Sequence, residues 1–174
     1  KSNQGTAFER DLEESSFAAI KFYKAQNNED ECVLNFNDNA TANFENEYDA
    51  VKLHSQEPSV AECALVSADG QLMSIDSRPL GQDAAISIPI YVEMPVSGTY
   101  RLRIEQINNL PFGSCLFVED LVTGNTMPFE EGQELVIVHT GNYSGNRFLI
   151  HASPSITVAE TNLDCYEAGN GSIA

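Results

Sequence analysis

Apolar and polar residues alternate with a period of two in several short segments of the chain. Tyr100, Leu102 and Ile104 lie on one side of such a segment, and arginine or glutamate fills the positions between. Residues 86–92 repeat the pattern, and Pro89 within them predicts an edge strand or a bulge, because proline cannot donate a ladder hydrogen bond. This alternation predicts strands with one buried face and one face in water.

Turn residues separate these segments from others of similar composition. Asp69-Gly70, between two apolar runs, is typical of a β-hairpin. About ten short strands joined by polar turns predict an all-β fold, an antiparallel β-sandwich of the jelly-roll kind. The strands are expected at 17–25, 32–37, 49–54, 61–67, 71–75, 86–92, 98–106, 114–121, 134–140 and 147–152.

The two ends of the chain depart from the strand pattern. Phe8 and Leu12 stand four residues apart among acidic residues, which fits a short amphipathic helix or, as we expect, a polar lead-in. Pro154 ends the last strand, and the start at Lys1, without Met or an apolar leader, indicates a domain cut from a longer precursor. The expected organisation is a lead-in at 1–16, the sandwich at 17–153, and a linker with the truncated start of a following repeat at 154–174.

The charge balance of the chain limits its partners. The 174 residues include 9 Lys and Arg against 26 Asp and Glu, a formal net charge of -17. Such a chain repels phosphate backbones and anionic lipid surfaces, so we expect no nucleic-acid partner. No apolar run in the sequence approaches the ~20 residues needed to span a bilayer, so we expect no membrane insertion. The charge is explained either by solubility or by cation binding.

An Asn- and Asp-rich segment at 35–49 gathers oxygen donors of the type that Ca²⁺ prefers. It lacks the fixed Gly and terminal Glu of an EF-hand loop. Its side chains could hold a structural calcium ion, or they could satisfy the backbone of turns, which is the commoner use. The calcium ligands would be Asp38, Glu45, Glu47 and Asp49.

The four cysteines lack the spacing of a zinc site and are interpreted as buried thiols or disulfide halves. Sequence alone allows three full pairings. Cys63 and Cys115 both lie inside expected strands, so a bond between them is the preferred prediction. It would leave Cys32 as a buried thiol and Cys165 for a partner in the missing part of the repeat.

Catalytic motifs are absent from the sequence, which has no GxSxG elbow, P-loop, GxGxxG or HExxH. His54, His139 and His151 lie near strand ends and could converge on a metal, but surface or half-buried positions are the simpler interpretation. We therefore predict a non-enzymatic protein without a cofactor, apart from the calcium alternative.

Exposed aromatic side chains are the usual platforms for sugars, and the chain has no Trp. Tyr91 alternates with the apolar Ile90 and Val92 and should point outward, and Tyr143 lies in a loop between two glycines. These two tyrosines are the candidate ligand-binding residues, although an exposed Tyr on a sheet is more often a packing choice.

Five motifs follow one another in the expected sandwich. Residues 40–53 read AT..F...YDA.KL, and shorter motifs follow at Gly70–Pro79, Thr99–Leu102, Val118–Gly124 and Arg147–His151. In this order they resemble a module of Bacteroidetes cell-surface proteins exported by the type IX secretion system. The tail from Val158 to Ile173 resembles the start of the Cys-containing repeats of gliding-motility adhesins.

The resemblance implies a structural or interaction module of a large, adhesin-like protein that is secreted or at the cell surface. Its partners would be neighbouring domains of the same polypeptide and surface glycans or proteins. A jelly-roll carbohydrate-binding module is the alternative, and a hydrolase is the weakest of the three hypotheses. The resemblance supplies no catalytic residues.

Overall fold

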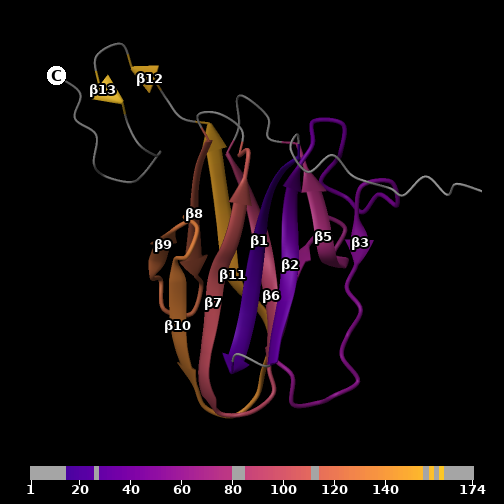
Figure 1. Cartoon of the computed structure of the whole chain (residues 1–174), viewed down its shortest axis with the longest axis vertical. Coiled ribbons are helices and arrows are strands. Elements are labelled where there is room, and N and C mark those ends of the chain that lie inside the picture. The colour runs from indigo at the N-terminus through magenta and orange to yellow at the C-terminus, as the bar shows by residue number, and fades with distance from the viewer. Residues whose placement is uncertain are drawn as a thin grey trace, which may run out of the picture.

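The computed structural model describes residues 15–25, 28–79, 85–110, 114–154, 157–158 and 161–162, and all regular elements within them are β-strands (Figure 1). No helix among these residues is long and apolar enough to span a bilayer. The strands are β1 (Ser16–Ala25), β2 (Asn28–Phe36), β3 (Ala50–Val51), β4 (Glu62–Val66), β5 (Leu72–Arg78), β6 (Ile86–Met94), β7 (Gly98–Asn108), β8 (Ser114–Asp120), β9 (Thr126–Pro128), β10 (Glu134–His139), β11 (Tyr143–Pro154), β12 (Thr157–Val158) and β13 (Thr161–Asn162).

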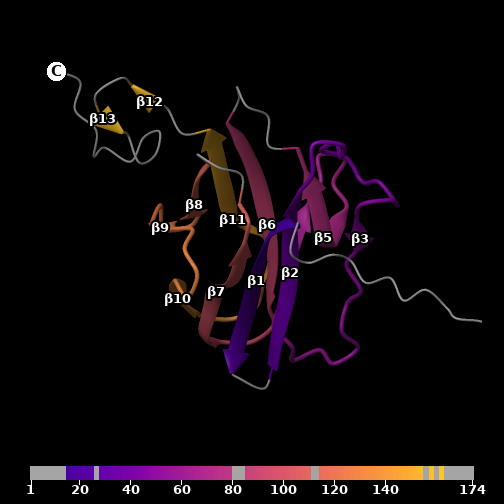
Figure 2. The same ribbon diagram turned by 45° about the horizontal axis from the view of Figure 1, so that its top comes forward.

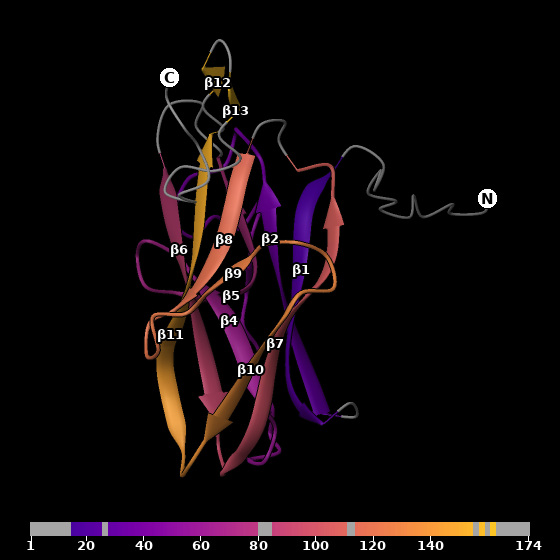
Figure 3. The same ribbon diagram turned by 90° about the vertical axis from the view of Figure 1, so that its left-hand side faces the viewer.

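Eleven strands form one continuous sheet in the order β10-β7-β1-β2-β5-β4-β6-β11-β8-β9, with β3 attached to β5. The sheet folds back on itself, so that β7, β1 and β2 face β6, β11 and β8 in a nearly closed barrel (Figures 1 and 3). Figure 2 shows β5 beside β2 and β3 at the margin of the sheet. The all-β sandwich prediction is confirmed, but the sheet is mixed, because β2 and β5 pair in parallel.

Aromatic side chains from three strands fill the space between the layers. Phe22, Tyr100 and Phe148 are fully buried. The rings of Phe22 and Tyr100 stack with their centroids 5.7 Å apart, and Phe148 meets Phe22 edge-on at 6.5 Å. The Tyr100 hydroxyl donates a 2.6 Å hydrogen bond to the carbonyl of Val96, which satisfies its polar end. The interior is thus a packed core.

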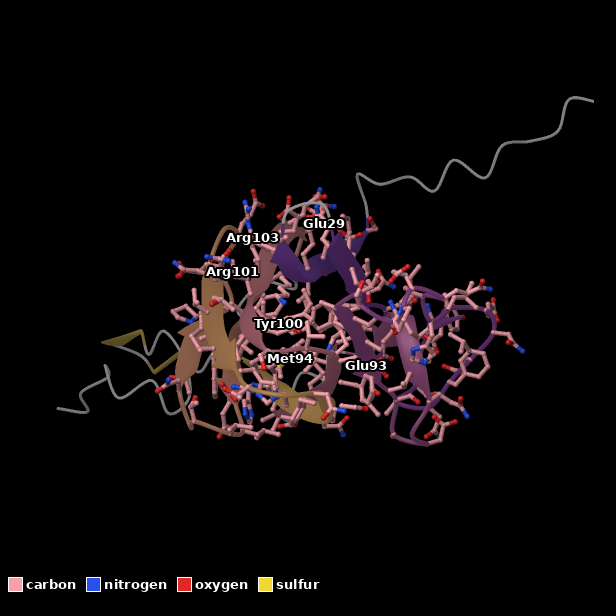
Figure 4. The ribbon with its side chains drawn as sticks, turned by 90° about the horizontal axis from the view of Figure 1, so that it is seen from below. Glu29, Glu93, Met94, Tyr100, Arg101 and Arg103 are labelled. Atoms are coloured by element: carbon pink, nitrogen blue, oxygen red, sulfur yellow. The ribbon has the colours of Figure 1, made fainter. Side chains whose placement is uncertain are left out.

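The alternation predicted for β7 is confirmed in the end-on view. Tyr100 and Met94 lie inside the ring of strands, whereas Arg101, Arg103 and Glu29 lie on its outer surface (Figure 4). Successive side chains of a strand point to opposite faces. The wet face of β7 can therefore carry charge without disturbing the core.

The strand around Pro89 differs from the expected edge position. β6 lies between β4 and β11 in the sheet. Its pairing with β4 stops at Ile90, however, so Pro89 lies just outside that ladder. β11 also carries the register shift of a bulge between Asn146 and Phe148. A proline is tolerated here because no β4 carbonyl requires its missing N–H.

The predicted hairpin turn joins β4 to β5. Gly70 has φ 86°, and the Ser67 and Gln71 backbones pair at 3.0 Å across the turn. Only glycine adopts such a φ without strain. The three-residue β9 was not predicted.

The strands of the main sheet run from Ser16 to Pro154, close to the expected bounds 17–153. β12 and β13 form a separate two-stranded sheet. The lead-in or helix expected around Phe8 and Leu12 lies outside the described residues.

Truncating the central ring of the core tests the packing. We expect Phe22→Ala to lower the free energy of unfolding by about 3–5 kcal/mol, because it removes a buried ring and leaves a cavity. Urea denaturation followed by tyrosine fluorescence measures the change. Val138→Ala on the surface is the control and should shift stability by less than about 0.5 kcal/mol. Similar effects of the two substitutions would contradict this description of the core.

Candidate functional site

The loop proposed to bind calcium uses two of its carboxylates to cap its own backbone. Glu45 accepts a 2.6 Å hydrogen bond from the Thr41 amide. Asp49 accepts 2.7 Å hydrogen bonds from the amides of Glu45 and Ser77 through its two oxygens. These contacts are the ones expected of turn-stabilising side chains.

The four predicted ligands do not gather at one point. Among the described residues, one group of three or more His, Cys, Asp or Glu side chains has ligand atoms within 4.8 Å of one another, and it lies elsewhere. Two of the four predicted ligands, Glu45 and Asp49, bond to amide groups instead, and the calcium site stays a prediction. The predicted set was Asp38, Glu45, Glu47 and Asp49.

The predicted Cys63–Cys115 disulfide is wrong. Cys63 is a free, buried thiol opposite Val92 of β6. Cys115 pairs with Ser153 on β11, one residue beyond the Ala152 that pairs with Ile86 of β6. Val92 and Ile86 lie six residues apart, which is about 20 Å along a strand. A disulfide needs Cα atoms within about 7 Å.

Tyr91 points outward from β6, as predicted. Its hydroxyl donates a 2.5 Å hydrogen bond to Glu93 and lies 2.6 Å from the hydroxyl of Ser144 on β11. Partial burial, followed by the hydrogen bond to Glu93, raises the pKa of Tyr91 above its usual value. The phenol therefore stays protonated and remains a hydrogen-bond donor at neutral pH.

Tyr143, the other candidate, is engaged by its neighbours. The Arg147 guanidinium lies 5.9 Å from its ring centroid, and His139 contacts the ring edge-on at 5.8 Å. Its hydroxyl donates to the Asn146 carbonyl at 3.2 Å. These contacts give Tyr143 a structural role on β11.

The three histidines do not converge. His139 packs against Tyr143. His151 stacks on Phe117 and bonds to Glu119 at 2.8 Å. His54 lies apart from both and forms a different cluster.

The group that the structure assembles comprises His54, Glu62 and Glu93, here called the His54–Glu62–Glu93 cluster. His54 Nδ1 lies 2.6 Å from Glu62 Oε2, and the Ser55 amide donates to the other Glu62 oxygen. Glu62 is only 5% exposed although it carries a carboxylate. It stands directly opposite Glu93 in the β4–β6 ladder. The Tyr91 hydroxyl donates a hydrogen bond to Glu93 and therefore lies beside the cluster.

The chemistry of the cluster follows from its donors. Like charges directly opposite in an antiparallel ladder repel, so a positive charge between Glu62 and Glu93 is favourable. A protonated His54 supplies one such charge. One imidazole and two carboxylates are also ligands that Zn²⁺ and related divalent ions accept, so these three side chains could hold a metal ion.

Sequence reasoning missed this cluster because its members are far apart along the chain. His54 is eight residues from Glu62, and Glu93 belongs to another strand. The strand register brings them together, and alternation alone does not fix register.

No protein-family model, curated protein or solved structure matches the chain.

Two substitutions in the same ladder pair test this electrostatic arrangement. Glu62→Gln should lower the free energy of unfolding by about 1–3 kcal/mol, because it weakens charge-assisted hydrogen bonds to His54 and Ser55. Glu93→Gln should raise it by up to about 1 kcal/mol, because it removes the repulsion and keeps an acceptor for Tyr91. Urea denaturation at pH 7 with EDTA provides the comparison. Equal losses would show that the cross-strand repulsion is unimportant.

Proposed function

We propose that the chain is a non-catalytic structural or interaction module of a large, adhesin-like protein that is secreted or displayed at the cell surface. The observation that carries the proposal is the apolar surface of β10. Val136 and Val138 are 58% and 81% exposed on this strand. β10 pairs with β7 on one side and has no strand on its other side among the described residues.

An exposed edge of this kind favours pairing with another chain segment. Unprotected edge strands offer free backbone donors and acceptors, and folded proteins normally guard them with charge, proline or bulges. The middle of β10 carries valine and isoleucine instead. We propose that a neighbouring domain of the same polypeptide covers this strand, by adding a strand or by packing on the valines.

The packed interior supports a surface-based role. Phe22, Tyr100 and Phe148 occupy the space in which a sandwich could otherwise enclose a small ligand. Binding would then depend on the outer faces and edges. The resemblance to surface-protein modules supplies the cellular setting of the proposal.

Hydrogen exchange tests the role of β10. We expect its outward-facing amides to exchange at least tenfold more slowly in a longer piece of the parent polypeptide than in this chain alone. Val136→Lys with Val138→Lys should abolish the added protection, because two charges would then occupy the covered face. Amides of the internal strand β6 are the control. Unchanged exchange of β10 in the longer protein would refute the proposal.

A carbohydrate-binding module is the second candidate. The observation that favours it is the outward-facing Tyr91, bonded to Glu93 and Ser144 beside the His54–Glu62–Glu93 cluster. An aromatic ring next to hydroxyl and carboxylate groups offers both stacking and hydrogen bonds to a sugar.

A glycan array, followed by calorimetry with and without EDTA, tests this second function. Under it, Tyr91→Ala should weaken binding at least tenfold, whereas Tyr143→Ala should change it little, because Tyr143 is held by Arg147 and His139. Loss of glycan binding in EDTA would show that a divalent cation takes part in the binding. An absence of glycan binding would leave the interaction module as the surviving proposal.

A further inference from the structure

Cys32 and Cys63 meet where the two layers of the sandwich approach each other. Cys63 Sγ lies 4.0 Å from the carbonyl oxygen of Ile20. Ile20 is the direct partner of Cys32 in the β1–β2 ladder. The Cys63 amide also donates a 2.7 Å hydrogen bond to Asp30, two residues before Cys32 on the same face of β2. Backbone and side-chain contacts thus place Cys63 beside Cys32.

The two thiols are buried together. Both residues are 0% exposed within the same hydrophobic core, and the interaction with Cys32 is the largest cause of the raised pKa of Cys63. Their Cα atoms belong to strands that approach from opposite sides of β5. Two buried thiols placed side by side in this way favour a disulfide, in contrast to the separation between Cys63 and Cys115.

Side chains, rather than a backbone ladder, join β2 to β4 at this point. β5 pairs with β4 through Leu65 and Val66 and with β2 from Val33 onward. The cysteines precede both paired stretches along their strands. Among the described residues here, Asp30 provides the connection, through the Cys63 amide and the buried Lys52 ammonium. The two layers therefore meet at a seam without ladder hydrogen bonds.

We propose that Cys32 and Cys63 form a disulfide that joins β2 to β4 when the protein folds in an oxidising compartment. The two thiols lose two protons and two electrons as the S–S bond forms. A small-molecule or protein disulfide accepts the electrons through a mixed disulfide and leaves as two thiols. The oxidising setting rests on the proposed extracellular function, whereas the pairing rests on the geometry alone.

The bond forms before the seam closes. The interaction with Cys32, followed by burial, stabilises the protonated form and raises the pKa of the Cys63 thiol well above its usual value. The thiolate is the species that attacks a disulfide, so the folded, reduced protein resists oxidation. Oxidation during folding, while both thiols are accessible, avoids this barrier.

Peptide mapping of the whole chain tests the pairing. The protein is unfolded, reduced, refolded with oxidised and reduced glutathione, alkylated and digested with trypsin without reduction. Each cysteine then lies in a different tryptic peptide, because Lys24, Lys52, Arg101, Arg103 and Arg147 separate them. We expect peptides 25–52 and 53–101 to be joined by a Cys32–Cys63 bond. Alkylated Cys32 and Cys63, or a bond from either to another cysteine, would overturn the proposal.

Stability and timing provide further readouts. The oxidised protein should melt about 10 °C above the same protein in dithiothreitol, because the bond restricts a loop of about 30 residues in the unfolded chain. Cys115→Ser with Cys165→Ser should keep this difference, and Cys32→Ser in that background should remove it.

Wild-type protein folded in reductant should gain no bond when glutathione disulfide is added afterwards. A formed bond without β10 protection would refute the proposed function and leave this inference intact.

Discussion

The pairing of β5 with both β2 and β4 is the constraint on which the fold depends. One continuous sheet becomes a sandwich only if its path turns from one layer to the other, and β5 makes that turn. Its parallel ladder with β2 involves four residues, from Val33 to Phe36 on the β2 side. The β4–β5 ladder adds two further pairs. Because the hydrogen-bonded contact is short, side chains at this turn have to complete the closure.

Ion pairs reinforce the same turn. Arg78 binds Asp76 at 2.8 Å within β5 and donates to the Val66 carbonyl of β4, also at 2.8 Å. Lys52 pairs with Asp30 of β2. All four charged side chains are largely buried. Burial raises the pKa of the Asp76 carboxyl, and the Arg78 guanidinium acts in the opposite direction.

The scarcity of cations makes their placement informative. The chain has nine Lys and Arg, yet Lys52, Arg78 and Arg147 are all buried against carboxylates. Arg147 pairs with Asp120 at 3.0 Å, which links β11 to the end of β8. Removing one member of a buried pair leaves an uncompensated charge and is strongly destabilising. Lys52, Arg78 and Arg147 therefore neutralise Asp30, Asp76 and Asp120, whereas the buried Glu62 has His54 beside it instead.

The sequence predicts which residues form strands and turns better than it predicts which of these elements lie next to one another. Alternation located β6 and β7, and Asp69-Gly70 located the β4–β5 hairpin, because these signals are local. Register is not local. It separates Cys63 from Cys115 and sets Glu62 opposite Glu93 from another strand, where His54 joins them.

The calcium site stays a prediction, because it rests on composition. The oxygen donors are present, but composition does not state where they point. Glu45 and Asp49 bond to amides of their own loop and of Ser77. A turn leaves backbone amides without hydrogen-bond acceptors, and nearby polar side chains bond to these amides before they are available to an ion.

The way the sheet ends explains why β10 is the exposed edge. β9 and β10 are the two ends of the strand path, and they are also consecutive in the chain (Figure 3). The segment between them crosses the opening: Phe129 is buried and donates to Leu116 of β8, while Gln133 accepts from Ile104 of β7. This crossing segment covers one end of the opening between the two terminal strands of the sheet, β9 and β10. β9 has only three residues, so among the described residues β10 extends beyond the crossing with β7 on one side and no strand on the other. A sandwich closed at the β2–β4 seam and open along β10 leaves that edge as the place where another segment can continue the sheet.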